Sequence, residues 1–129
     1  MLVSIRLIVL RKVGGSFIIR GCPFLIEIGE WGLFGLPGGG LTIDGSFGLS
    51  SLGGFGGLTF IGGDLYLINT GLPDLRELKN LIRLLGCFHI IGNEQIVDMR
   101  GLNSLTEIGE DVRIINNKFI NNLDSLSSL

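Results

Sequence analysis

The sequence predicts an all-β fold, a right-handed parallel β-solenoid of about five coils of 24 residues each. Three observations lead to this prediction. Large apolar residues recur at a nearly constant interval of about 24 residues, apolar and polar residues alternate inside each repeat, and glycines recur at one place in it. We interpret residues 1–129 as a single repeat domain, either complete or a fragment of a longer array.

Seven columns of large apolar residues define the repeat, and a deletion between Leu65 and Leu72 gives them one shared shorter step. Two columns mark the expected strands: Phe17, Leu41, Leu65, Phe88 and Val112, then Ile19, Ile43, Leu67, Ile90 and Ile114. Four others are Leu25, Leu49, Leu72, Ile96 and Ile120; Ile28, Leu52, Leu75, Met99 and Leu123; Leu7, Trp31, Phe55, Leu78, Leu102 and Leu126; and Leu10, Phe34, Leu58, Leu81, Leu105 and Leu129. The seventh is Val13, Ile61, Leu84 and Ile108, interrupted by Pro37.

Spacing within the repeat predicts its local structure. Val112 and Ile114 flank Arg113, the alternation of a strand with one buried face. We therefore expect parallel strands in register over 17–19, 41–43, 65–67, 88–90 and 112–114, about 4.8 Å apart. The three-residue steps upstream of each strand are typical of corners or short 3₁₀ segments. Glycines such as Gly38, Gly62 and Gly109 follow the seventh column, where we expect them to supply positive φ.

Composition excludes several classes of protein. The chain has 22 glycines and no alanine, which argues against a helical bundle, and its glycines lack the period of collagen. The net charge of −2 indicates no nucleic-acid partner. No apolar stretch is long enough for a membrane span. Arg6 interrupts the apolar N-terminal segment, so we interpret that segment as repeat and see no signal peptide.

The repeat resembles a known family. Val112 to Asn117 matches the leucine-rich-repeat core L-x-L-x-x-N, and Phe17 to Cys22 matches its variant ending in cysteine. The segments 58–75 and 101–129 are similar to the receptor L-domain repeats of surface proteins. The resemblance covers essentially the whole chain and is weaker over 32–57. It implies an extracellular or cell-surface binding module, with no catalytic residue to transfer.

The two cysteines and the single histidine predict neither a disulfide nor a metal site. Cys22 and Cys87 lie three coils apart, roughly 14 Å along the axis. A disulfide needs Cα atoms within about 7 Å, so we expect two free thiols. Because His89 is the only histidine and no second pair of ligands accompanies it, we expect no metal site and no cofactor. We interpret His89 as a surface residue.

One carboxylate pair offers the best case for an enzyme. Asp74 and Asp98 share a column in adjacent coils, about 5 Å apart, which is near the spacing of retaining glycosidases. Arg76 and Arg100 lie two residues after these aspartates, so the four side chains can also be interpreted as a surface charge network. We favour the network, and we interpret Glu107, Glu110 and Asp111 as a solvated edge. The glycine runs lack the lysine of a phosphate-binding loop. We therefore predict a protein that is not an enzyme.

One outward column is a candidate interaction face. Strict alternation points three isoleucines outward beside an aromatic pair, and an exposed apolar stripe usually marks an interaction site. The face comprises Tyr66, Ile68, His89, Ile91, Arg113 and Ile115. The alternative is that the chain bends there and tucks the isoleucines into a corner.

Two functions remain open at this point. The chain is a surface module that binds a protein or a glycan through this face, or it is a structural subunit that stacks end to end. The sequence contains no capping helix, and open solenoid ends expose core residues and strand edges. That favours self-association of the chain with other copies.

Overall fold

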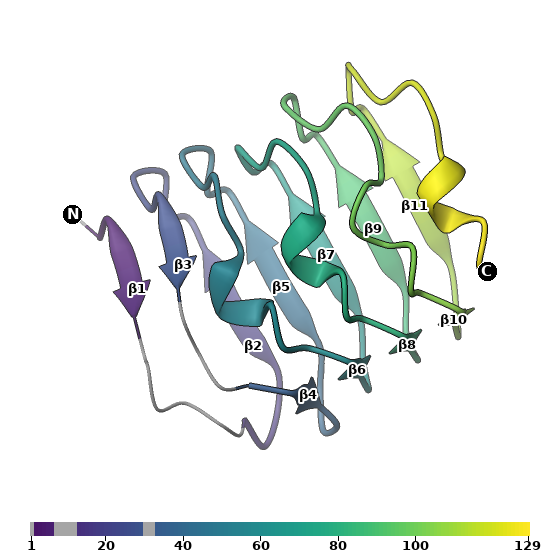
Figure 1. The fold of residues 1–129 in the computed structure, drawn as a ribbon. Helices are drawn as coiled ribbons and strands as arrows, with labels where there is room; N and C mark the ends of the chain where they lie inside the picture. Colours follow the sequence, from purple (N-terminus) through teal and green to yellow (C-terminus); the bar gives the residue numbers. More distant parts are fainter. Residues whose placement is uncertain (1, 7–12, 30–32) are drawn as a thin grey trace.

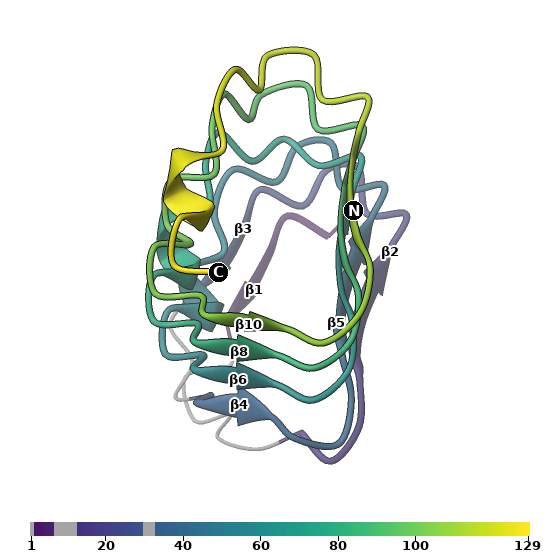
Figure 2. The same ribbon diagram turned by 90° about the vertical axis from the view of Figure 1, so that its right-hand side faces the viewer.

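Successive turns of the chain stack along one axis as a parallel β-solenoid, seen from two directions in Figure 1 and Figure 2. This computed structural model describes residues 2–6, 13–29 and 33–129. The fold is all-β apart from three 3₁₀ helices of three residues each, η1, η2 and η3. No helix among the described residues is long and apolar enough to cross a membrane.

The main sheet contains five parallel strands in the order β11-β9-β7-β5-β2. They are β2 (Phe17–Arg20), β5 (Leu41–Asp44), β7 (Leu65–Ile68), β9 (Phe88–Ile91) and β11 (Val112–Ile115). Their register confirms the prediction, because the five residues of the first predicted column pair in succession from Phe17 to Val112. The solenoid has about four turns where the sequence predicted about five coils. Five stacked strands enclose only four complete turns.

The rest of each turn is built from shorter elements. A second parallel sheet runs β10-β8-β6-β4, and β1 pairs with β3. These strands are β1 (Ser4–Arg6), β3 (Glu27–Gly29), β4 (Gly35–Leu36), β6 (Phe60–Ile61), β8 (Arg83–Leu84) and β10 (Glu107–Ile108). The 3₁₀ helices η1 (Gly53–Phe55), η2 (Arg76–Leu78) and η3 (Asp124–Leu126) lie on the side opposite the main sheet (Figure 2). In these three turns the three-residue steps form 3₁₀ segments, whereas from Met99 to Leu105 they form single hydrogen-bonded turns.

The inward columns merge into one continuous core. Phe55, Leu78 and Leu102 are fully buried and stack as predicted, whereas Leu7 and Trp31, assigned to the same column, and Leu10 of the next column lie outside the described residues. On the last turn the pattern changes. Val112 and Leu123 are largely exposed, although the residues above them in their columns are buried. The burial of each column therefore depends on the turns stacked on both sides of it.

The turn that contains residues 33–36 departs from the predicted columns. The sequence placed Phe34 in an inner column and treated Pro37 as an interruption of another. Both residues are exposed, and Leu33 and Leu36 are fully buried instead. The register explains the error, because Leu36 pairs with Ile61 and this turn therefore lies one residue earlier than a strict spacing of 24 would place it. With Leu36 as its member in this turn, the seventh column is therefore uninterrupted.

The glycines that follow the seventh column do not have the predicted role. Gly62 and Gly109 lack positive φ, but a Cβ at either one would overlap a carbonyl oxygen of the preceding turn. Glycine is required there by close approach of two backbones. Positive φ occurs instead mostly where the main strands end, at Gly21, Gly45, Asn69, Gly92 and Asn116. Asparagine tolerates this left-handed conformation better than other residues with a side chain.

A buried polar ladder follows the main sheet and joins successive turns. The Asn93 carboxamide oxygen accepts hydrogen bonds from the N–H and hydroxyl of Thr70, at 3.0 and 2.6 Å. Its nitrogen donates to the carbonyl of Leu67 at 2.8 Å. Asn117 repeats the arrangement one turn later by accepting from the N–H of Asn93 at 2.9 Å. Thr70, Asn93 and Asn117 therefore satisfy backbone groups, whereas the buried hydroxyl of Ser46, at the equivalent position of an earlier turn, has no hydrogen-bond partner among the described residues.

Candidate functional site

The candidate face lies on the outer surface of the main sheet. In β7 and β9 the burial alternates, so Leu65 and Leu67 are buried while Tyr66 and Ile68 are partly exposed. The same alternation leaves Ile91 partly exposed, and Ile115 in β11 is 44% exposed. The isoleucines therefore lie on the outer face, and none of them is tucked into the core.

Tyr66 and His89 stack on this face. Their ring centroids are 4.7 Å apart and the rings are inclined by 28°, because the two residues pair directly across β7 and β9. Arg113 pairs with His89 on the other side and is exposed. The Nε2 atom of His89 is buried and has no hydrogen-bond partner among the described residues. The sheet thus presents a flat aromatic pair with a cation beside it.

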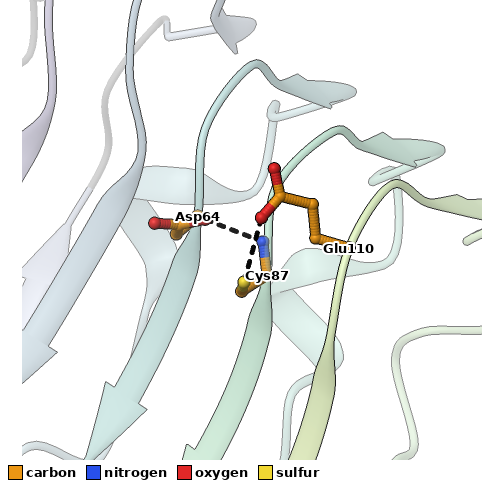
Figure 3. Close-up of side chains that lie close together, drawn as sticks. All are labelled: Asp64, Cys87 and Glu110. Carbon is orange, nitrogen blue, oxygen red and sulfur yellow. Dashed lines mark hydrogen bonds between the residues drawn. The ribbon is translucent and has the colours of Figure 1, made fainter.

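A hydrogen-bonded cluster adjoins the aromatic pair where the main strands begin (Figure 3). Asp64, which precedes β7, accepts a hydrogen bond from the hydroxyl of Tyr66 at 2.9 Å and from the N–H of Cys87 at 2.7 Å. The Cys87 thiol in turn donates to Glu110 at 3.4 Å. The cluster therefore links three consecutive turns and fixes the Tyr66 ring.

These hydrogen bonds shift three pKa values. The N–H of Cys87, with a smaller contribution from the Tyr66 hydroxyl, holds the pKa of Asp64 below its usual value. The hydrogen bond to Asp64 raises the pKa of Tyr66 to about 12. Burial raises the pKa of the Cys87 thiol, and its hydrogen bond to Glu110 adds to the increase. At neutral pH Asp64 is charged, whereas Tyr66 and Cys87 retain their protons.

The same cluster has a composition that a metal ion can use. Asp64, Cys87 and Glu110 each place one possible ligand atom within 4.8 Å of the others. Oxygen and thiolate ligands suit zinc. A metal ion would replace the hydrogen bonds of the cluster and the thiol proton. In the part of the chain that the structure describes, the side chains form hydrogen bonds that link three consecutive turns.

Sequence reasoning missed this cluster. Cys87 was considered only for a disulfide, although Asp64 occupies the equivalent position, immediately before its own strand. Glu110 lies one residue before the equivalent position in the next turn, which is Asp111, so the repeat spacing alone does not identify it. The two cysteines are free, as expected from their separation along the solenoid.

The carboxylates considered for catalysis are bound within their own turns. Asp74 accepts a hydrogen bond from the N–H of Arg76 at 3.0 Å and forms an ion pair with its side chain at 3.1 Å. Asp98 and Arg100 repeat both contacts, at 2.8 and 3.5 Å. Each carboxylate therefore organises the turn that follows it. This geometry favours the surface network over the glycosidase-like pair.

Glu107 and Asp111, which the sequence assigned to a solvated edge, also have partners. Glu107 forms an ion pair with Arg83 at 2.6 Å, and Asp111 lies 3.6 Å from Arg113. Both pairs connect exposed side chains, which contribute little to stability. This edge is solvated, as predicted, apart from the bond between Glu110 and Cys87.

Comparison of the chain with family models, with curated proteins and with solved structures gave no match.

Proposed function

We propose that the chain is a non-catalytic binding module of the cell surface or extracellular space, which contacts a protein partner through the outer face of its main sheet. The face comprises Tyr66, Ile68, His89, Ile91, Arg113 and Ile115. The resemblance of the repeats to receptor L-domains supports the location and the class of function.

The stacked pair of Tyr66 and His89 beside the isoleucine stripe is the observation that carries this proposal. Aromatic residues and arginine are enriched at protein interfaces, where they fill the desolvated centre. Here they project from a sheet whose backbone is fixed by parallel hydrogen bonds to neighbouring turns. Little conformational entropy is therefore lost when a partner covers them.

The geometry of the acidic residues supports a role without catalysis. Asp74 and Asp98 are each bound to an arginine of their own turn, and Asp64 is occupied by two donors. A carboxylate that acts as a general base must lie within reach of a substrate proton. These carboxylates organise the backbone instead.

A selection experiment tests the proposal. The folded chain is immobilised, a displayed library of random peptides is selected on it, and enriched peptides are measured by calorimetry. Ile115→Asp should weaken binding by about tenfold or more, because it places a charge in the apolar centre of the contact. Ile82→Asp is the matched control, since Ile82 is 45% exposed but lies away from the face. Equal affinity for the wild type and Ile115→Asp would contradict the proposal.

End-to-end stacking is the second candidate function, and one observation favours it. On the last turn Leu123 and Leu129 are 48% and 51% exposed, whereas Leu52, Leu75 and Leu105 in the same columns are fully buried. The outer edge of β11 is also unpaired among the described strands. A second copy, or a further turn of a longer chain, placed against this end would bury the leucines and extend the sheet.

A further inference from the structure

A groove lies at the opposite ends of the main strands from the acidic cluster. It has a volume of about 420 Å³, within the range of about 300–1,000 Å³ typical of small-molecule sites. It is lined by Phe47, the 69–71 segment, Ile91, Gly92, Glu94, Gln95 and Asn116. Only Ile91 belongs to the proposed protein-binding face, so the groove is a separate feature beside it.

The groove coincides with the single deletion in the repeat. Two residues separate the polar ladder from the next core residue in other turns, as between Asn93 and Ile96, but only one separates Thr70 from Leu72. The shorter loop contains Gly71, where a Cβ would overlap the carbonyl oxygen of Phe47. The loop is therefore one residue shorter than its neighbours, and it packs directly against the backbone of the preceding turn.

Four polar side chains around the groove are unoccupied, whereas the hydroxyl of Thr70 belongs to the polar ladder. Asn69, Glu94, Gln95 and Asn116 make no side-chain hydrogen bond or ion pair with the described part of the chain. By contrast, Asn93, one position before Glu94, uses its whole carboxamide in the polar ladder. The groove therefore has three carboxamides and one carboxylate available to a ligand, beside one aromatic ring.

The aromatic ring is that of Phe47, which is 63% exposed. A flat apolar ring favours the C–H face of a sugar, and each carboxamide offers a donor and an acceptor that match neighbouring hydroxyl groups. Among the described residues, no lysine or arginine lines the groove, which disfavours anionic ligands. Glu94 is the only charged residue among those lining residues, and its carboxylate can accept hydrogen bonds from hydroxyls.

A peptide strand fits the groove less well. Strand addition needs free backbone groups, but the N–H groups of Asn69 and Gly92 already donate to the next turn, at 2.9 and 3.0 Å. The N–H groups of Thr70 and Asn93 are bound to asparagine side chains. Recognition must therefore use the side chains. We infer that this groove binds a neutral saccharide, with a sugar ring stacked on Phe47 and its hydroxyls held by Asn69, Gln95 and Asn116.

The test uses the full chain and a panel of linear oligomers of glucose, mannose, galactose and N-acetylglucosamine, with sulfated oligomers as a separate arm. Binding is first detected on an array and then measured by calorimetry. We expect at least one neutral oligomer to bind. Phe47→Ala should weaken that binding by about tenfold, because it removes the stacking ring. Gln95→Ala should weaken it by several-fold, because it removes a donor and an acceptor.

Phe24→Ala is the matched control, since Phe24 is 59% exposed in the corresponding loop of an earlier turn and does not line the groove. It should leave the affinity unchanged. No binding of neutral oligomers, binding of sulfated oligomers alone, or equal affinities of the wild type, Phe47→Ala and Gln95→Ala would each overturn the inference. Ile115→Asp separates this result from the protein-binding proposal, because it alters the face without altering the groove.

Discussion

The hydroxyl of Tyr66 donates a hydrogen bond of 2.9 Å to Asp64, which lies two residues earlier and immediately before strand β7. This bond stabilises the neutral phenol, and the pKa of Tyr66 is raised to about 12 from an ordinary value of 10.0. Because the folded pKa is the higher one, the bond contributes to stability below pH 10 and its contribution is lost as the pH rises through 12.

Tyr66 is the only tyrosine, so its titration can be followed directly by absorbance near 295 nm. We expect a midpoint near pH 12 in the wild type. In Asp64→Asn the negatively charged acceptor is removed, and the midpoint should move toward 10. Circular dichroism at each pH shows whether the chain is still folded. A wild-type midpoint near 10 in folded protein would show that the bond does not persist in solution.

Replacement of Asn93 by alanine should be costly. The change leaves the buried N–H of Thr70 without its partner and removes one hydrogen bond from the carbonyl of Leu67. We expect a loss of about 3 kcal/mol in the free energy of unfolding, measured by urea denaturation. Asn103→Ala is the control, because Asn103 is exposed and its side chain makes no hydrogen bond with the described residues. Similar losses in both variants would argue against the polar ladder.

A charge in the inner stack should prevent folding. Leu78 is fully buried between Phe55 and Leu102, so Leu78→Asp would enclose a carboxylate without a partner. We expect a cost of about 5 kcal/mol or more, comparable to the whole stability of a small domain. Lys79→Asp on the exposed neighbouring position should fold normally. A soluble Leu78→Asp variant with cooperative unfolding would contradict the assignment of this column.

The isolated chain should associate with itself. Light scattering over a range of concentrations should show a mass that increases with concentration, or precipitation, because the leucines of the last turn and the edge of β11 are uncovered. Adding polar capping coils at both ends should make the chain monomeric. Leu123→Lys with Leu129→Lys should reduce the association, and Leu85→Lys on the flank should not. A chain that remains monomeric at high concentration would remove the main support for end-to-end stacking.

The regular part of this fold could be predicted from the sequence because stacking imposes it. Each turn must place an apolar residue above its equivalent, so the spacing from Phe17 to Val112 specifies strand, direction and register together. The turn that contains Leu33 could not be placed in the same way. There the chain contains two apolar candidates side by side, Leu33 and Phe34, and only the pairing of Leu36 with Ile61 shows which one points inward.

The candidate sites were less predictable because they depend on bonds between turns. Alternation along β7 and β9 was sufficient to place Tyr66 and His89 on one face. The bond from Cys87 to Glu110 depends on how far a side chain reaches across to the next turn, which no spacing specifies. The groove at Gly71 begins with a deletion visible in the sequence. The groove can bind a ligand through the side-chain amides that the polar ladder does not use. These amides can be identified only from the hydrogen bonds of the structure.

The central claim, that the outer face of the main sheet binds a partner, is tested most directly by methyl NMR. The chain is labelled at its isoleucine methyl groups and titrated with a peptide recovered from the selection. We expect the signals of Ile68, Ile91 and Ile115 to shift together with one dissociation constant, while that of Ile82 stays unchanged. Shifts at Ile82 without shifts at the other three would place the contact elsewhere and contradict the account.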